Sequence, residues 1–253
     1  MRRWRQQRRL SQLELSVQVG ISTRHLSFVE TGRSVPSRAM VLRLAEYLAV
    51  PLRERNRILL AAGHAPAYTE SRLDAPALQA VMAAVRQILA AHEPFPALIV
   101  DRAWNVVDAT SSIALFTGDA APWLLEHPMN AYRIGLHPDG LVSRIVNAEQ
   151  WRAHLLHRLR REAAITGDPL VEALYEEVSG YPGCSGKPEP AITGAGEPAL
   201  PLLLRHGGEV LSFLSTVATF GTAVDITVAE ISIEAFYPAD RRTGEGLREI
   251  FGG

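Results

Sequence analysis

The chain has 253 residues, 47% of them hydrophobic and 21% charged, and its formal net charge is −1. This composition allows a sizeable core in one large domain or two ordinary ones. It excludes a membrane span, because no run of 18 apolar residues occurs, and the arginine-rich N-terminus lacks the apolar stretch of a secretory signal. The single cysteine, Cys184, excludes an internal disulfide, so we expect a cytoplasmic protein.

Charge is distributed unevenly along the chain. Residues 1–64 contain 12 arginines and 4 glutamates, a net charge of +8, whereas residues 65–253 carry a net charge of −9. A basic segment of this kind is typical of a protein that binds a polyanion. Arginines also occur on ordinary solvated surfaces, so the charge alone leaves both interpretations open.

The apolar spacing in residues 1–64 predicts an all-α domain of five helices. Ser11, Ser22 and Ser37 are good N-cap residues, and Glu14 completes a capping box with Ser11. Pro51 fits the first position of the fifth helix. The expected helices run from Trp4 to Arg9, from after Ser11 until Gly20, from Thr23 to Glu30, from after Ser37 through Leu48, and from Pro51 through Leu60.

The second and third helices are separated by a turn of a few residues that contains Gly20. Two helices joined in this way form a helix-turn-helix, in which the first crosses the DNA backbone and the second lies in the major groove, where base edges carry a distinguishable hydrogen-bond code. The apolar residues expected to lock the two helices together are Val17, Ile21, Leu26 and Val29. The arginines available for phosphates are Arg2, Arg5, Arg8, Arg9, Arg33 and Arg38.

Residues 4–62 resemble the XRE family of helix-turn-helix regulators, which are related to the lambdoid phage repressors. The resemblance rests on "LSQ.EL" followed by "VG.S...LS..E.GR..PS...L..LA..L.VP". It implies double-stranded DNA as the partner, with Gln12 gripping a phosphate and Thr31 and Arg33 contacting the backbone. The full set of DNA-binding residues that it implies is Gln12, Ser22, Thr23, Arg24, Ser27, Phe28, Thr31 and Arg33.

Three of the implied roles have specific alternatives. Arg24 is the best candidate for base recognition, since a bidentate arginine–guanine contact is worth roughly 1–3 kcal/mol of discrimination, but it is also able to contact only a phosphate. Phe28 stands where the family more often has a polar residue, and it either touches a thymine methyl group or packs internally. Arg5 and Glu30 match an ion pair that ties the first helix to the third, which we interpret as structural.

After residue 64 the pattern changes. Residues 65–96 are expected to form a linker with a connecting helix at 77–91, and residues 97–253 a second domain. Strands are expected at "ALIVD", "WNVVDAT", "LPLLLRHG", "EVLSFLSTVATF" and "VDITVAEISIEAF", with a hairpin turn at residues 206–208. Helices are expected to start at Asn147 and Asp168, and a long loop at residues 179–201. In the last strand the apolar phase slips between Val228 and Ile231, which predicts a bulge or burial on both faces.

"PALIVDRAWNVVDATSSIALF" and "MNAYRIGLHPDGL" resemble the MmyB-like ligand-binding domain, which has a PAS-like α+β fold with an antiparallel sheet. The resemblance implies a small hydrophobic effector, such as a fatty acid, in an internal cavity. Arg133 or Arg102 would pair with a carboxylate, although either also fits an ordinary surface role, and Asn130 and Arg133 also fit a role in holding their loop together. The candidate ligand-binding residues are Trp104, Phe116, Trp123, Tyr132, Arg133 and Phe213, whose aromatic members fit an ordinary core equally well.

Two other functions are weighed against a sensor. An enzyme finds little support, because Cys184 has no histidine near it in sequence, and His154 and His157 share their helix with four arginines. No phosphate-binding glycine loop, H-E-x-x-H or G-x-S-x-G motif occurs, so we expect no enzymatic activity, metal or cofactor. The second domain is alternatively a dimerisation platform without a ligand. We expect a homodimer in either case, with an effector acting through the helix at 77–91.

Overall fold

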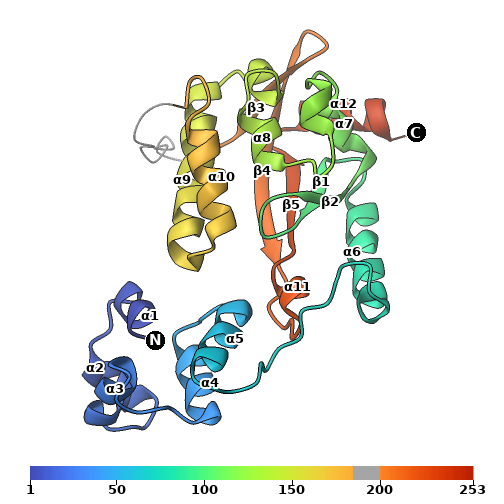
Figure 1. Ribbon diagram of the computed structural model, residues 1–253. Coiled ribbons are helices and arrows are strands. Elements are labelled where there is room, and N and C mark those ends of the chain that lie inside the picture. Colours follow the sequence, from blue (N-terminus) through green and yellow to red (C-terminus); the bar gives the residue numbers. More distant parts are fainter. Residues whose placement is uncertain (185–199, 253) are drawn as a thin grey trace. The chain divides into compact units, whose positions relative to one another are not determined.

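The computed structural model describes residues 1–184 and 200–252, and the chain divides into two compact units (Figure 1). Unit 1 consists of Met1–Arg72 and Thr222–Ala229, and unit 2 of Leu73–Gly221 and Glu230–Gly253. The first unit therefore extends past the predicted boundary at residue 64 and includes a segment from late in the chain. Residues 185–199 of the predicted loop lie outside the described residues.

Unit 1 contains the five predicted helices, which are α1 (Arg2–Gln7), α2 (Gln12–Gln18), α3 (Thr23–Glu30), α4 (Arg38–Tyr47) and α5 (Leu52–Ala61). The capping box of Ser11 and Glu14 is formed in both directions. The side chains of Ser22 and Ser37 each accept a hydrogen bond from a backbone N–H of the first turn that follows. Pro51 precedes α5 as its N-cap residue rather than occupying its first position. The all-α prediction for this region is confirmed.

The packing of α2 against α3 differs in register from the prediction. Leu15, Val19 and Leu26 are buried in the core of unit 1. Val17, which was expected to lock the two helices, is 67% exposed. Because residues two positions apart lie on nearly opposite sides of a helix, choosing Val17 instead of Leu15 and Val19 inverted the face of α2.

The predicted ion pair between α1 and α3 is confirmed. Arg5 donates to Glu30 through Nε and Nη2 at 2.8 and 2.9 Å, and the Glu30 side chain is only 1% exposed. Gln12 donates to the same carboxylate at 2.8 Å. Burial alone would raise the pKa of Glu30, but the hydrogen bonds from Arg5 and Gln12 outweigh it and lower the pKa. Glu30 therefore joins the first three helices.

Unit 2 is built around a five-stranded antiparallel sheet with the order β2-β1-β5-β4-β3. Its strands are β1 (Ala97–Val100), β2 (Val106–Ala109), β3 (Leu202–His206), β4 (Glu209–Thr219) and β5 (Ser232–Pro238). His206 pairs with Glu209, so the predicted hairpin turns through Gly207 and Gly208, whose φ angles of 56° and 84° suit glycine. The α+β class predicted for the second domain is confirmed.

Seven helices and four short 3₁₀ segments complete the part of the chain that the structure describes. The helices are α6 (Gln79–His92), α7 (Ala114–Thr117), α8 (Ala131–Leu136), α9 (Ala148–Thr166), α10 (Pro169–Ser179), α11 (Ile226–Ala229) and α12 (Arg241–Phe251). The 3₁₀ segments are Pro76–Leu78, Ser111–Ile113, Pro122–Leu125 and Leu141–Arg144. The helix starts at Asn147 and Asp168 are confirmed, whereas α12 was not predicted.

Both faces of the sheet in unit 2 are covered. Figure 1 shows α9 and α10 side by side on one face and α6 on the other. Alternate residues of the central strands follow this division, since Leu98 and Phe236 join the main core while Ile99 and Ile233 pack with α6. The strands therefore carry two apolar stripes with opposite phase.

The segment between β4 and β5 is folded as part of unit 1. The predicted strand "VDITVAEISIEAF" is wrong in its first half, because Ile226–Ala229 is the short helix α11. Asp225, which is 8% exposed, accepts hydrogen bonds from the hydroxyls of Thr69 and Ser71 at 2.9 and 2.8 Å. The apparent slip of the apolar phase thus marks a change from helix to strand rather than a bulge.

Replacing Glu30 by glutamine should lower the free energy of unfolding by about 3 kcal/mol, because Arg5 would keep its charge with no carboxylate beside it. The contribution of Glu30 should be complete above its unfolded pKa and lost as the pH falls through its lowered folded pKa. Urea denaturation between neutral and acidic pH measures both effects. Glu245→Gln, which removes an exposed i,i+4 pair with Arg241, is the control and should change stability by about 0.5 kcal/mol or less.

Candidate functional site

The first candidate site is the exposed face of α3 in unit 1. Arg24 is exposed, and its guanidinium lies over the ring of the half-buried Phe28, 5.4 Å from the ring centre. In the described part of the chain neither Arg24 nor Arg33, which is also exposed, has a carboxylate partner. Both side chains therefore keep their donors for another acceptor, as contact with DNA requires.

The other predicted DNA-binding residues make contacts that set the geometry of this face. The hydroxyl of Thr23 lies 2.9 Å from that of Ser16, which ties the start of α3 to α2. Ser22 caps α3, and the hydroxyl of Thr31 donates to the carbonyl of Ser27 at its end. These contacts hold the turn and the helix in place, while any contact that they make with DNA stays a prediction.

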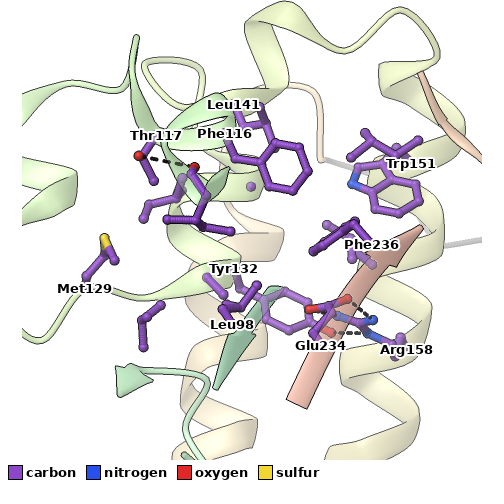
Figure 2. A pocket seen from close by; sticks show the side chains of 17 residues that line it. Leu98, Phe116, Thr117, Met129, Tyr132, Leu141, Trp151, Arg158, Glu234 and Phe236 are labelled. Atoms are coloured by element: carbon purple, nitrogen blue, oxygen red, sulfur yellow. Dashed lines mark hydrogen bonds and ion pairs between the residues drawn. The ribbon is translucent and has the colours of Figure 1, made fainter. Parts of the chain in front are cut away.

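The second candidate site is an internal cavity of unit 2, with a volume of about 70 Å³. It lies between the sheet and the helices that cover the main core. Figure 2 shows Phe116, Leu141 and Trp151 at one end, and Tyr132, Arg158 and Glu234 together at the other. The cavity is therefore apolar over most of its wall and polar at one end, which is typical of a site for a small amphiphilic ligand.

Arg158 is the centre of the polar end. It donates to Glu234 through Nη1 at 2.7 Å and Nη2 at 3.3 Å, and to the Tyr132 hydroxyl through Nε at 2.8 Å. Its guanidinium also lies over the ring of Trp104, 4.6 Å from the centre, and the Trp104 Nε1–H donates to Glu162 at 3.0 Å. A cation–π contact of this kind is worth most where water is excluded.

The protonation of these groups follows from their surroundings. Burial alone would lower the pKa of the Arg158 guanidinium, but Glu234 and Tyr132 outweigh it and raise the pKa. Burial raises the pKa of Tyr132, so its hydroxyl stays protonated at neutral pH. Burial also raises the pKa of Glu162. Arg158 is therefore a permanent cation, and its charge is balanced inside the fold.

The predicted ligand-binding residues fall into two groups. Phe116 and Tyr132 line the cavity, whereas the other four do not. Phe213 packs behind Phe116 with ring centres 5.6 Å apart, and Trp104 lies behind Arg158. Trp123 is 49% exposed, with its ring edge against His137.

The two cations proposed for a ligand carboxylate are already paired outside the cavity. Arg133 donates twice to Glu177, at 2.8 Å in both bonds, and Arg102 donates to Asp168 at 2.9 Å. Asn130 caps α8 through its side-chain oxygen, and its amide donates to the carbonyl of Ala103, so it holds its loop together. Arg133 therefore does not line this cavity, and its contact with a ligand stays a prediction.

Arg158 and Glu234 were not predicted as site residues. From the sequence, Arg158 was noted only as one of the four arginines that share a helix with His154 and His157. It points into the core with Glu234, whose side chain is 5% exposed. The spacing of Trp151, Leu155 and Arg158 carried the signal, since positions i, i+4 and i+7 share one face of a helix. A single acidic residue inside the apolar strand "ISIEAF" was the corresponding signal for Glu234.

The residues considered for catalysis do not form a site of that kind. Cys184 is buried, which raises the pKa of its thiol and opposes thiolate chemistry. His154 stacks on Trp151. Across residues 1–184 and 200–252, no three His, Cys, Asp or Glu side chains lie close enough together to hold a metal ion. Within the same residues, no helix has the length and apolar character needed to cross a membrane.

Comparison with known families places both candidate sites inside matched regions. Residues 1–55 match the helix-turn-helix family, and residues 81–250 match the family described as the MmyB-like transcription regulator ligand binding domain. The chain belongs to the MmyB-like transcription regulators. It is accordingly a DNA-binding transcription regulator with a ligand-binding domain. Among curated proteins, no relative matches this MmyB-like regulator.

In this MmyB-like regulator, Arg158→Met should lower the free energy of unfolding by about 3 kcal/mol, because Glu234 would be left buried without its partner. The double change Arg158→Met, Glu234→Leu should recover most of that loss, since an apolar pair needs no compensating charge. Urea denaturation of the three proteins measures the difference. A double variant no more stable than Arg158→Met would show that the ion pair itself stabilises the fold.

Proposed function

We propose that this regulator binds a specific double-stranded DNA sequence through α3, and that a small hydrophobic effector in the cavity of unit 2 changes that binding. The observation that carries the proposal is the apolar cavity with one polar end, enclosed within the region that matches a ligand-binding domain. A ligand changes the balance between two arrangements of a protein only through its different affinities for them. The effector is therefore expected to bind one arrangement more tightly.

The size of the cavity limits which effectors fit without rearrangement. A volume of about 70 Å³ holds several water molecules, and it is smaller than the roughly 150 Å³ of an engineered cavity that binds benzene. A fatty acid is the effector expected from the sequence, but a long acyl chain requires the walls to move apart. The cavity is lined in part by Met129, Ile113 and Leu141, whose side chains can change rotamer to make room for a larger ligand.

The regulator is further proposed to act in the cytoplasm as a homodimer, because two copies of a short recognition helix double the contact with DNA. A dimerisation platform without a ligand is the second candidate for unit 2. The observation that favours it is an open apolar groove between α6 and the sheet, lined by Ile88, Leu89, Ala218, Phe220 and Tyr237, among others. Native mass spectrometry of the purified protein separates the two candidates, since a bound small molecule supports only the sensor.

DNA binding is tested by gel shift at low ionic strength with duplexes selected from a random pool. Enrichment of a defined sequence supports the proposal, and failure to retard any duplex would contradict it. Because the phosphate contribution falls steeply with salt, the assay is repeated at increasing salt concentration to separate specific from non-specific binding.

Arg24→Ala should weaken binding to the selected sequence by about tenfold to a hundredfold and binding to random DNA much less, if Arg24 pairs with a guanine. Arg33→Ala is the matched comparison, because it removes the same charge from an exposed position at the predicted backbone contact. It should weaken binding to both duplexes alike and lower the slope of log affinity against log salt concentration by about 1. Equal losses on both duplexes for Arg24→Ala would assign Arg24 to a phosphate instead. Fluorescence anisotropy titrations measure these affinities.

A further inference from the structure

From the polar end of the cavity we infer that the effector carries a neutral head group that both donates and accepts a hydrogen bond, such as a hydroxyl, and that a carboxylate is rejected. This inference rests on the proposed function and names the class of ligand within it. It depends on the charges and on the unused hydrogen-bonding capacity of Tyr132, Arg158 and Glu234.

The charge balance disfavours an anionic head group. Arg158 is the cation of the cluster, and its Nη1 donates to the carboxylate of Glu234 at 2.7 Å. A further carboxyl, that of Glu162, accepts a hydrogen bond from the Trp104 ring over which the Arg158 guanidinium lies. One positive charge is therefore set against two carboxyl groups. A ligand carboxylate would bring an uncompensated negative charge into a buried site, where it is costly.

The hydrogen-bonding capacity favours a hydroxyl. The Tyr132 oxygen accepts from Arg158, and among the described residues its own proton is donated to no acceptor. Glu234 receives one short bond on Oε1, whereas its Oε2 receives only a 3.3 Å contact. A hydroxyl can accept from Tyr132 and donate to Glu234 at once, which matches both unused positions.

Three probes with the same number of non-hydrogen atoms test this inference on the intact protein: hexan-1-ol, 1-methoxypentane, which cannot donate, and pentanoate, which is charged. Dissociation constants are measured by ligand-observed NMR at neutral pH. We expect hexan-1-ol to bind about tenfold more tightly than either of the others, because a hydrogen bond to a charged acceptor is worth at least that factor. Equal binding of the alcohol and the ether, or tightest binding of pentanoate, would overturn the inference.

A substitution inverts the expected order. Glu234→Gln should lower the affinity for hexan-1-ol and raise the affinity for pentanoate, by about tenfold each, because Arg158 then lacks its carboxylate. Glu177→Gln, the same change in the exposed pair with Arg133, is the matched control and should leave the order unchanged. If none of the three probes binds the wild-type protein, the proposed sensor function fails; if all bind without preference, only the inference about the head group fails.

A second observation independently supports a route between the cavity strand and the helices of unit 1. Besides the contacts of Asp225, the backbone N–H of Ile226 donates to the carbonyl of Thr69 at 2.8 Å. The hydroxyl of Thr227 donates to the backbone carbonyl of Ser71 at 2.6 Å. The segment 222–229 is thus held to the chain that follows α5. Only two residues then separate α11 from β5, which carries Glu234 and Phe236 in the cavity wall.

The same hydrogen bonds continue into α5. The side-chain oxygen of Asn56 accepts from the backbone N–H groups of Ala67 and Tyr68, and its amide donates to the carbonyl of Tyr68 at 2.8 Å. A continuous series therefore runs from α5 through residues 67–71 to Asp225 and along the chain into β5. We propose that a displacement of β5 at the cavity reaches unit 1 through this series, in addition to any effect through α6.

Hydrogen–deuterium exchange with mass spectrometry tests the route without DNA or effector. Phe236→Leu, which alters the cavity wall on β5, should accelerate exchange in peptides covering residues 67–71. In a protein that already carries Asp225→Ala, or the milder Thr227→Val, adding Phe236→Leu should not accelerate this exchange further. Val224→Ala, at a 77% exposed position of the same segment, is the control and should leave the response intact. An absent response to Phe236→Leu, or a response that survives both substitutions, would overturn the proposal.

Discussion

The structure of unit 2 depends on the burial of both faces of strand β5. Ile233 and Ala235 pack toward α6, while Glu234 and Phe236 face the cavity. A slip of one residue would turn the charged side chain of Glu234 toward α6 and remove it from Arg158, so the register is strongly specified. Pairing of Leu98 with Glu234 and of Ile99 with Ile233 keeps β1 in the same phase. The position of the polar end of the cavity is thereby set by the sheet.

The two candidate sites are built in different ways. The face of α3 is formed within a short stretch of chain, where caps and the Arg5–Glu30 pair hold a helix whose outward side chains are left available. The cavity collects residues from β1, β5, α8 and α9, and its polar groups neutralise one another. A buried ion pair is weak evidence for stability. Its place at the end of an apolar cavity agrees with the role in ligand recognition that we propose for it.

Prediction from the sequence succeeded where short-range rules act and failed where packing decides. The caps at Ser11, Ser22 and Ser37 were correct because each is a hydrogen bond within one turn. The inward face of α2 was misassigned because Leu13 and Val17 repeat with the same spacing as Leu15 and Val19, and only the neighbouring helix distinguishes the two pairs. The helix α11 was taken for a strand because its apolar run is too short to show a helical period.

The sequence by itself determined the basic helical domain, its helix-turn-helix and the α+β class of the second domain, because charge, caps, turn glycines and apolar periods are local properties of the chain. Only the tertiary structure decided that Arg158 and Glu234, 76 residues apart, form the polar end of a cavity while Arg133 does not line it. It also decided that residues 222–229 fold with unit 1. These pairings arise from the packing of distant segments around a shared core, for which no local pattern in the sequence specifies the partner.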